Sequence, residues 1–205
     1  MGKIPVHSPA RAVTTAALMV AGLITTALLS SLAAPTARAT SVQHFGTAQL
    51  TELSDTIVRG TVTKVEARLH PEHQFIYTYV TVRVDEPLKG LVTAGSEIVF
   101  QELGGRVDRT IHHVPGVPDY REGEQVVSFL ENHVGGFYRT FGMIQGKFSV
   151  ATDPRNGREI LTRPAEWNDV ALAQLGSVSD LSPMRPDASY DSAEMLSAIR
   201  EWTRR

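Results

Sequence analysis

Hydrophobic residues alternate with polar ones along much of the chain, which is typical of β-strands that bury one face. The segment 75–85 shows this most clearly, because its even positions are isoleucine, threonine or valine while its odd positions include Phe75, Tyr77 and Tyr79. Pro87 is expected to end this strand. The same pattern predicts further strands at 57–68, 97–103, 124–130, 137–141, 147–151 and 158–162.

The connections between these segments carry recognisable turn residues. Gly60 interrupts the first strand, and the hydrophobic residues of this strand change between even and odd positions, so we expect a β-bulge near Gly60. The segment 132–136 and the Asn156-Gly157 pair predict hairpin turns. The connection 104–123 differs, because it runs for twenty residues with several glycines and prolines. Structureless connections of this length in compact domains are usually functional or disordered.

Two helices flank the strands. A short one is predicted at 47–55, and a final one begins after Asp191, where Glu194 completes a capping box. The hydrophobic residues of the final helix recur at spacings of four and three, which places Met195, Ile199 and Trp202 on one face. We expect this face to pack on the barrel or sheet.

The N-terminus has the layout of a secretory signal peptide. Lys3 and Arg11 precede an apolar run at 12–34, and Ala37-Arg38-Ala39 supplies small residues at a cleavage site. An uncleaved membrane anchor is the alternative, since the run is near spanning length. Cleavage is favoured by the many alanine, threonine and serine residues. The expected parts are a signal peptide at 1–39, a barrel domain at 40–163, and an irregular, proline-containing tail with a helix packed on the barrel at 164–205.

Charge and cysteine content narrow the classes of partner. The chain has no cysteine, which excludes disulfides, cysteine-ligated zinc and attachment of a lipid to cysteine. Removal of the signal peptide takes away three basic residues and no acid, so the formal charge moves from −2 to −5. An acidic domain is a poor candidate for binding nucleic acid. We expect a periplasmic or extracellular location and no membrane association after cleavage.

Three segments, in the same order, resemble netrin-like domains and tissue inhibitors of metalloproteinases. Residues 53–62 look like their opening strand, 76–90 like their second strand with its Lys-Gly turn, and 122–130 like a later strand after a glycine turn. The layout is also similar to that of exported bacterial proteins. The resemblance implies an OB-like antiparallel barrel of five to seven strands, with a short N-terminal helix and a C-terminal capping helix.

The zinc-chelating mechanism of those inhibitors is not implied for this chain. They use an N-terminal cysteine, whereas the predicted mature N-terminus here is Thr40. The sequence also lacks a Gly-x-Ser-x-Gly elbow and a His-Glu-x-x-His helix. We therefore expect a non-catalytic binding module without a cofactor, whose partner is another exported or envelope protein or an unidentified ligand. Its oligomeric state stays open.

Two surfaces are candidates for the contact. The first is the 104–123 connection, through its arginines, histidines and tyrosine: Arg106, Arg109, His112, His113 and Tyr120. The second is the row Phe75, Tyr77 and Tyr79, which faces outward if the valines fill the barrel. Alternatively, the final helix or the tail covers this row with Trp167 and Trp202. The two alternatives differ in the exposure of Tyr77.

Two other functions stay open. A metal-dependent hydrolase would use His112, His113 and acids of the 104–123 connection, and His70 and His73 could join a metal site. Adjacent strand residues point apart, so His112 and His113 would ligate together only in a loop. We predict no metal site on this basis. The third function is a structural component of the cell envelope.

Overall fold

The computed structural model describes residues 41–163, 171–173 and 189–204, which belong to the unit Ala39–Arg205. The helices are α2 (Thr47–Leu53) and α3 (Ser192–Trp202), with short 3-10 turns η1 (Val134–Gly136) and η2 (Met143–Gly146). The strands are β1 (Ser41–Gln43), β2 (Thr56–Leu69), β3 (Ile76–Lys89), β4 (Glu97–Leu103), β5 (Gly105–Val107), β6 (Thr110–His112), β7 (Gln125–Asn132), β8 (Tyr138–Thr140), β9 (Lys147–Thr152), β10 (Glu159–Thr162), β11 (Ala171–Ala173) and β12 (Ser189–Asp191). The predicted signal peptide, residues 164–170 and 174–188 of the predicted tail, and Trp167 lie outside the described residues.

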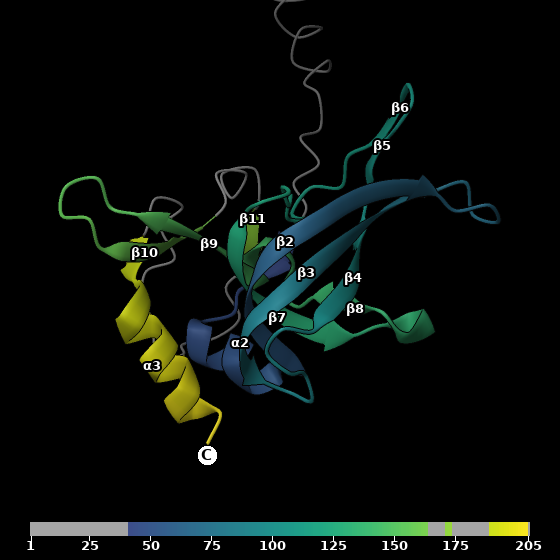
Figure 1. The fold of residues 1–205 in the computed structure, drawn as a ribbon. Coiled ribbons are helices and arrows are strands. Elements are labelled where there is room, and N and C mark those ends of the chain that lie inside the picture. The colour runs from purple at the N-terminus through teal and green to yellow at the C-terminus, as the bar shows by residue number, and fades with distance from the viewer. Residues whose placement is uncertain (1–40, 164–170, 174–188, 205) are drawn as a thin grey trace, which may run out of the picture. The chain divides into compact units, whose positions relative to one another are not determined.

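Five of these strands close into a barrel (Figure 1). Their order is β7–β2–β3–β4–β8, and β8 pairs back with β7 to complete the ring. The prediction of a mainly β chain with a barrel is therefore confirmed. The expectation of a wholly antiparallel barrel is wrong at one joint, because β4 and β8 run parallel where Phe100 pairs with Tyr138. Strands β9, β10 and β12 continue the same sheet outward from β7.

The longest pairing joins β2 and β3, each of fourteen residues. One of its register shifts falls between Arg59 and Gly60, which confirms the predicted bulge. Gly60 is required there because an added Cβ would lie 2.6 Å from Cγ1 of Val82. β3 also runs through Pro87 to Lys89, so the prediction that the proline ends the strand is wrong. β3 pairs with β4 only as far as Arg83, and a proline is tolerated where one edge of a strand is free.

Hydrophobic side chains form two cores on opposite sides of β7. The barrel core contains Val58, Val62, Val80, Val82, Val84, Ile98, Phe100, Tyr120, Val126 and Leu130. The helix core contains Leu50, Ile57, Leu88, Val127, Phe129, Phe148, Leu161, Met195, Leu196 and Ile199. Alternate residues of β7 enter alternate cores, so this strand is buried on both faces.

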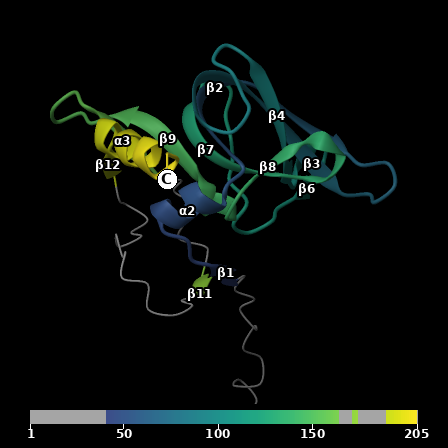
Figure 2. The same ribbon diagram turned by 90° about the horizontal axis from the view of Figure 1, so that it is seen from below.

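The final helix begins where predicted, and of the predicted capping box it has the half made by the Asp191 side chain. The side chain of Asp191 accepts a hydrogen bond from the backbone N–H of Glu194 at 3.1 Å, which caps α3. Met195 and Ile199 are buried in the helix core, and Trp202 packs against it. Figure 2 shows α3 beside β9 and β12, on one side of the barrel.

The 104–123 connection is not structureless. It begins with the β5–β6 hairpin, whose turn includes Asp108 at a φ of 52°. The rest of it returns to the barrel, where Gly116, Pro118 and Tyr120 are buried. Its length therefore reflects a hairpin followed by a packed segment. Within the residues described, no helix has the length and apolar character needed to cross a membrane.

Docking of α3 can be tested by removing a buried side chain. Ile199 is fully buried, so Ile199→Ala should lower the free energy of unfolding by about 3 kcal/mol, as measured by urea denaturation. Ser197 is exposed on the same helix, and Ser197→Ala should change it by less than about 0.5 kcal/mol. Equal effects of the two substitutions would show that α3 does not depend on the helix core.

Candidate functional site

The row of aromatic residues on β3 lies on the outer face of the barrel. Phe75, just before β3, and Tyr77 and Tyr79 on it are all half-buried. Tyr79 pairs across the sheet with Gln101, whose side-chain amide donates a hydrogen bond to the Tyr79 hydroxyl at 3.1 Å. The valines of the same strand fill the barrel core, so the side chains at the alternate positions, including Tyr77 and Tyr79, point outward.

Ring contacts connect this row to neighbouring connections. We use the term aromatic surface for the rings of His70, Phe75, Tyr77, Tyr79, His112 and Phe137. Adjacent centroids lie 4.8 Å apart for Phe75 and His112, 5.4 Å for Tyr79 and Phe137, 5.5 Å for Phe75 and Tyr77, and 5.9 Å for His70 and Tyr77. These spacings are typical of tilted and edge-on aromatic pairs.

The final helix does not cover the aromatic surface. Trp202 packs against the helix core instead, so the alternative in which it covers the row is wrong. The alternative involving Trp167 falls outside the described residues. The contacts of α3 explain why it does not reach the row. Its apolar face is buried in the helix core, and its Arg200 is bound to Glu86 at 2.7 Å.

The β5–β6 hairpin adjoins the aromatic surface. Arg106, Arg109 and His113 are exposed on or beside this hairpin, and His112 is half-buried. The Nδ1 atom of His112 accepts a hydrogen bond from the backbone N–H of Ile76 at 3.1 Å, which fixes its ring against Phe75. The structure therefore joins the two surfaces that the sequence presents separately.

Tyr120 does not belong to this exposed surface, which corrects its place among the contact residues. It is 7% exposed and packs edge-on against Phe100 at 4.9 Å. Its hydroxyl lies 2.8 Å from Oγ1 of Thr140, and the ammonium of Lys147 lies 4.5 Å from its ring centroid. Burial raises the pKa of the Tyr120 hydroxyl. Tyr120 thus anchors the end of the 104–123 connection inside the barrel.

A buried carboxyl that sequence reasoning missed lies beside Tyr120. Glu102 continues the inward row of β4 after Ile98 and Phe100, and it is 4% exposed. Thr140 donates to its Oε1 atom twice, from the backbone N–H at 3.0 Å and from the hydroxyl at 2.5 Å. Burial raises the pKa of Glu102 to about 7, against the effect of these hydrogen bonds. The period-two pattern of 97–103 is the signal that would have found it.

The hydroxyls around Glu102 form a directed chain. A Thr140 hydroxyl that donates to the carboxylate has no second proton, so the Tyr120 hydroxyl must donate to Thr140. The hydroxyl of Ser128 lies 3.4 Å from that of Tyr120 and continues the chain. Strands β4, β7 and β8 are thereby linked inside the barrel.

Glu102 lines a cavity of about 410 Å³ at the end of the barrel, which we call the barrel-mouth cavity. Its apolar wall includes Val65, Ala67, Val80, Val117 and Pro118. Arg106, one of the predicted contact residues, and Arg121 also line it. A cavity of this size is in the range that holds small molecules.

Two glycines shape the entrance of this cavity. Gly104 and Gly105 follow β4 with φ values of 91° and 129°. A Cβ on Gly105 would collide with Oγ1 of Thr78, which donates to the carbonyl of Gly104 at 2.8 Å. Glycine is therefore needed for the backbone to pass this close to β3.

The histidines of the chain do not assemble as the hydrolase alternative requires. In the described ranges, a set of residues able to hold a metal ion comprises His70, Glu72 and His73, with ligand atoms within 4.8 Å of one another. Neither His112 nor His113 belongs to it. The His70 and His73 rings are stacked at 4.6 Å, and Glu72 and His73 are exposed.

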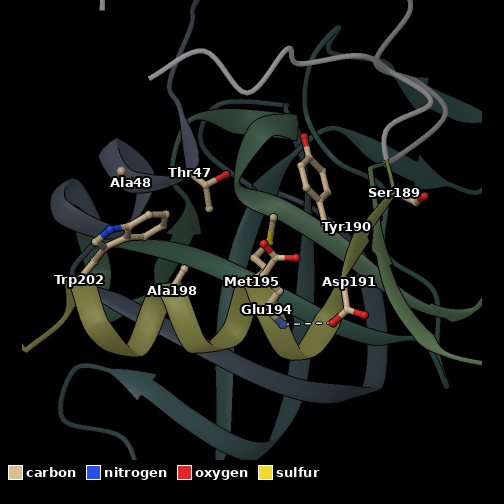
Figure 3. Close-up of a pocket in the computed structure, with 9 residues that line it drawn as sticks. All are labelled: Thr47, Ala48, Ser189, Tyr190, Asp191, Glu194, Met195, Ala198 and Trp202. Atoms are coloured by element: carbon tan, nitrogen blue, oxygen red, sulfur yellow. Dashed lines mark hydrogen bonds between the residues drawn. The ribbon is translucent and has the colours of Figure 1, made fainter. Parts of the chain in front are cut away.

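A second cavity, of about 310 Å³, lies between α2 and α3 (Figure 3). Its wall is formed mainly by α3 and by the adjoining strand β12, with Thr47 and Ala48 of α2 opposite. Met195 and Trp202 give it an apolar side, while Asp191 is engaged in capping the helix. Of the residues named in the sequence analysis, only those of the final helix and its cap line this cavity.

Comparison with protein-family models, curated proteins and solved structures found no match to this chain.

Ionisation of Glu102 should make stability depend on pH. Its folded-state pKa of about 7 exceeds its ordinary value of 4.5, so the stability it contributes is fully present below 4.5 and is lost as the pH rises through 7. Glu102→Gln should remove this dependence and stabilise the fold above pH 7 by at most about 3 kcal/mol, measured by urea denaturation across the range. Glu97→Gln, exposed on the outer face of β4, should keep the dependence.

Proposed function

We propose that this chain is an exported, non-catalytic binding module with an OB-like barrel, and that it binds a partner protein through the aromatic surface and the β5–β6 hairpin. The observation that carries the proposal is a set of half-exposed rings on and beside the outer face of β3, in which Phe75 contacts His112 of the adjacent hairpin. The likeness to netrin-like domains and tissue inhibitors of metalloproteinases is part of the same proposal.

The strand order supports the OB-like part. In chain order the five barrel strands are β2, β3, β4, β7 and β8. In the sheet, β2 lies between β3 and β7, and β4 pairs with β8. OB-type folds are five-stranded Greek-key barrels that bind through their second and third strands and the flanking connections. In this chain those are β3, β4 and the connections 70–75 and 133–137, where the aromatic surface lies.

The charges on this face favour a protein over a nucleic acid. On β2, beside Tyr79, Glu66 lies 2.6 Å from Lys64 and 2.8 Å from Arg68. Hydrogen bonds from Arg68 and Lys64 lower the pKa of Glu66 to about 2, so the carboxylate stays charged. Because Glu66 is paired with both cations and cancels the charge of one of them, they are less suited to replacing the counterions of a phosphate backbone.

Exposed apolar side chains around the rings also suit a protein partner. Ile111 is 55% exposed and Val134 82%, and they lie on or beside the hairpins that carry the aromatic surface. Aromatic residues with an apolar surround and a polar rim are enriched at protein interfaces. An exported or envelope protein is therefore the proposed partner, and no cofactor is assigned.

The contact surface can be mapped by photo-crosslinking in cells that export the protein. A photo-reactive amino acid in place of Tyr77 or Ile111 should give an adduct of the same mass, because both lie on the proposed surface. The same group in place of Leu91, which is fully exposed on the β3–β4 connection, should not give that adduct. Tyr79→Ala should lower the adduct yield from position 111 about tenfold. Equal adducts from positions 77 and 91 would contradict the proposal.

Export can be tested independently of the partner. The protein recovered from the periplasm or medium should begin at Thr40, as read by N-terminal sequencing. Ala39→Phe places a bulky residue at the cleavage site and should leave the longer precursor attached to the membrane fraction. Recovery of protein beginning at Met1 from the cytoplasm alone would contradict export.

A further inference from the structure

Glu102 presents one unpartnered oxygen to the barrel-mouth cavity. Both hydrogen bonds that Thr140 donates to Glu102 reach Oε1. Within the described residues Oε2 has no hydrogen-bond partner, and it is not fully enclosed. Since Glu102 as a whole is 4% exposed and lines the cavity, the accessible part of the carboxyl faces this space.

The two buried or half-buried cations near Glu102, Arg139 and Lys147, are each bound to another carboxylate. Arg139, whose positive charge acts on Glu102, is bound to Glu131 at 2.6 Å. Lys147 lies over the Tyr120 ring and is bound to Glu124 at 2.8 Å. Glu102 is therefore a buried carboxyl without a dedicated cation, an arrangement that costs stability when it ionises.

The remaining wall of the cavity is suited to an apolar body. Val65, Ala67 and Val80 come from the inner faces of β2 and β3, and Val117 and Pro118 close the other side. Asp119 also lines the cavity, but it is exposed on the rim. Oε2 of Glu102 is therefore the single carboxylate oxygen of the buried wall, and one oxygen is too little to hold a metal ion, which needs several oxygen ligands. It is enough to orient one cationic hydrogen-bond donor.

We propose that the barrel-mouth cavity binds a small molecule with a primary ammonium group on an apolar body. The ammonium donates to Oε2 of Glu102 in the depth of the cavity, and the apolar body lies against the valines. Arg106 and Arg121 stand on the exposed rim, in solvent, where their repulsion of the ammonium is screened. This site is on the inside of β3 and β4, so it is independent of the aromatic surface on their outside.

Three probes of equal length separate the possible head groups: hexylamine, hexanol and hexanoate. Calorimetric titration of the mature protein at about pH 8, where Glu102 is ionised, should show binding of hexylamine and much weaker binding of the other two. Glu102→Gln should weaken hexylamine binding about tenfold or more, through loss of the charge-assisted hydrogen bond. Glu97→Gln, on the outer face of the same strand, should leave it unchanged.

A second variant tests the position of the apolar body. Ala67→Phe fills the cavity from β2 and should abolish hexylamine binding while Glu102 is still present. A lower pH should also weaken binding, because the Glu102 carboxyl becomes protonated; the other titratable or charged groups that act on it are Arg139, Glu131 and Tyr120. Tighter binding of hexanoate than of hexylamine, equal affinity in Glu102→Gln, or no binding of any probe would each overturn the proposal.

Discussion

The hydrogen bonds between Glu102 and Thr140 tie β4 to β8 at the place where the barrel closes, and much of the structure depends on this joint. β8 has only three residues, and its parallel pairing with β4 consists of Phe100 and Tyr138. Thr140 adds two hydrogen bonds to the carboxylate and one contact to Tyr120. A short strand is thereby held by side chains where backbone pairing alone is sparse.

The same strands carry two different chemistries on their two faces. The inner face of β3 and β4 is apolar until Thr78 and Glu102, where it becomes polar around the barrel-mouth cavity. The outer face carries Tyr77 and Tyr79. Since side chains alternate across a strand, the aromatic surface proposed to contact a partner and the cavity proposed to hold a small ligand lie on opposite faces of the same pair of strands.

Local pattern was enough to predict most elements, because each depends on neighbours in the chain. The bulge at Gly60, the Asp191 cap and the buried face of α3 all follow from residues within one turn or one strand. Predictions that needed distant partners were less successful. Pro87 lies within a strand because β4 has already left that edge of β3, and Tyr120 is buried because Phe100 and Lys147 enclose it.

The sequence by itself determined which residues of a strand or helix share a face, and where the seven predicted strands and the two helices lie. Only the tertiary structure decided that β8 closes the ring, that His112 packs on Phe75, and that Glu102 lies beside a cavity with one oxygen unpartnered. The physical reason is the distance along the chain over which each kind of interaction acts. Alternation and capping act over a few residues, whereas burial of a carboxyl and contact between hairpins depend on strands that meet only after the barrel has closed.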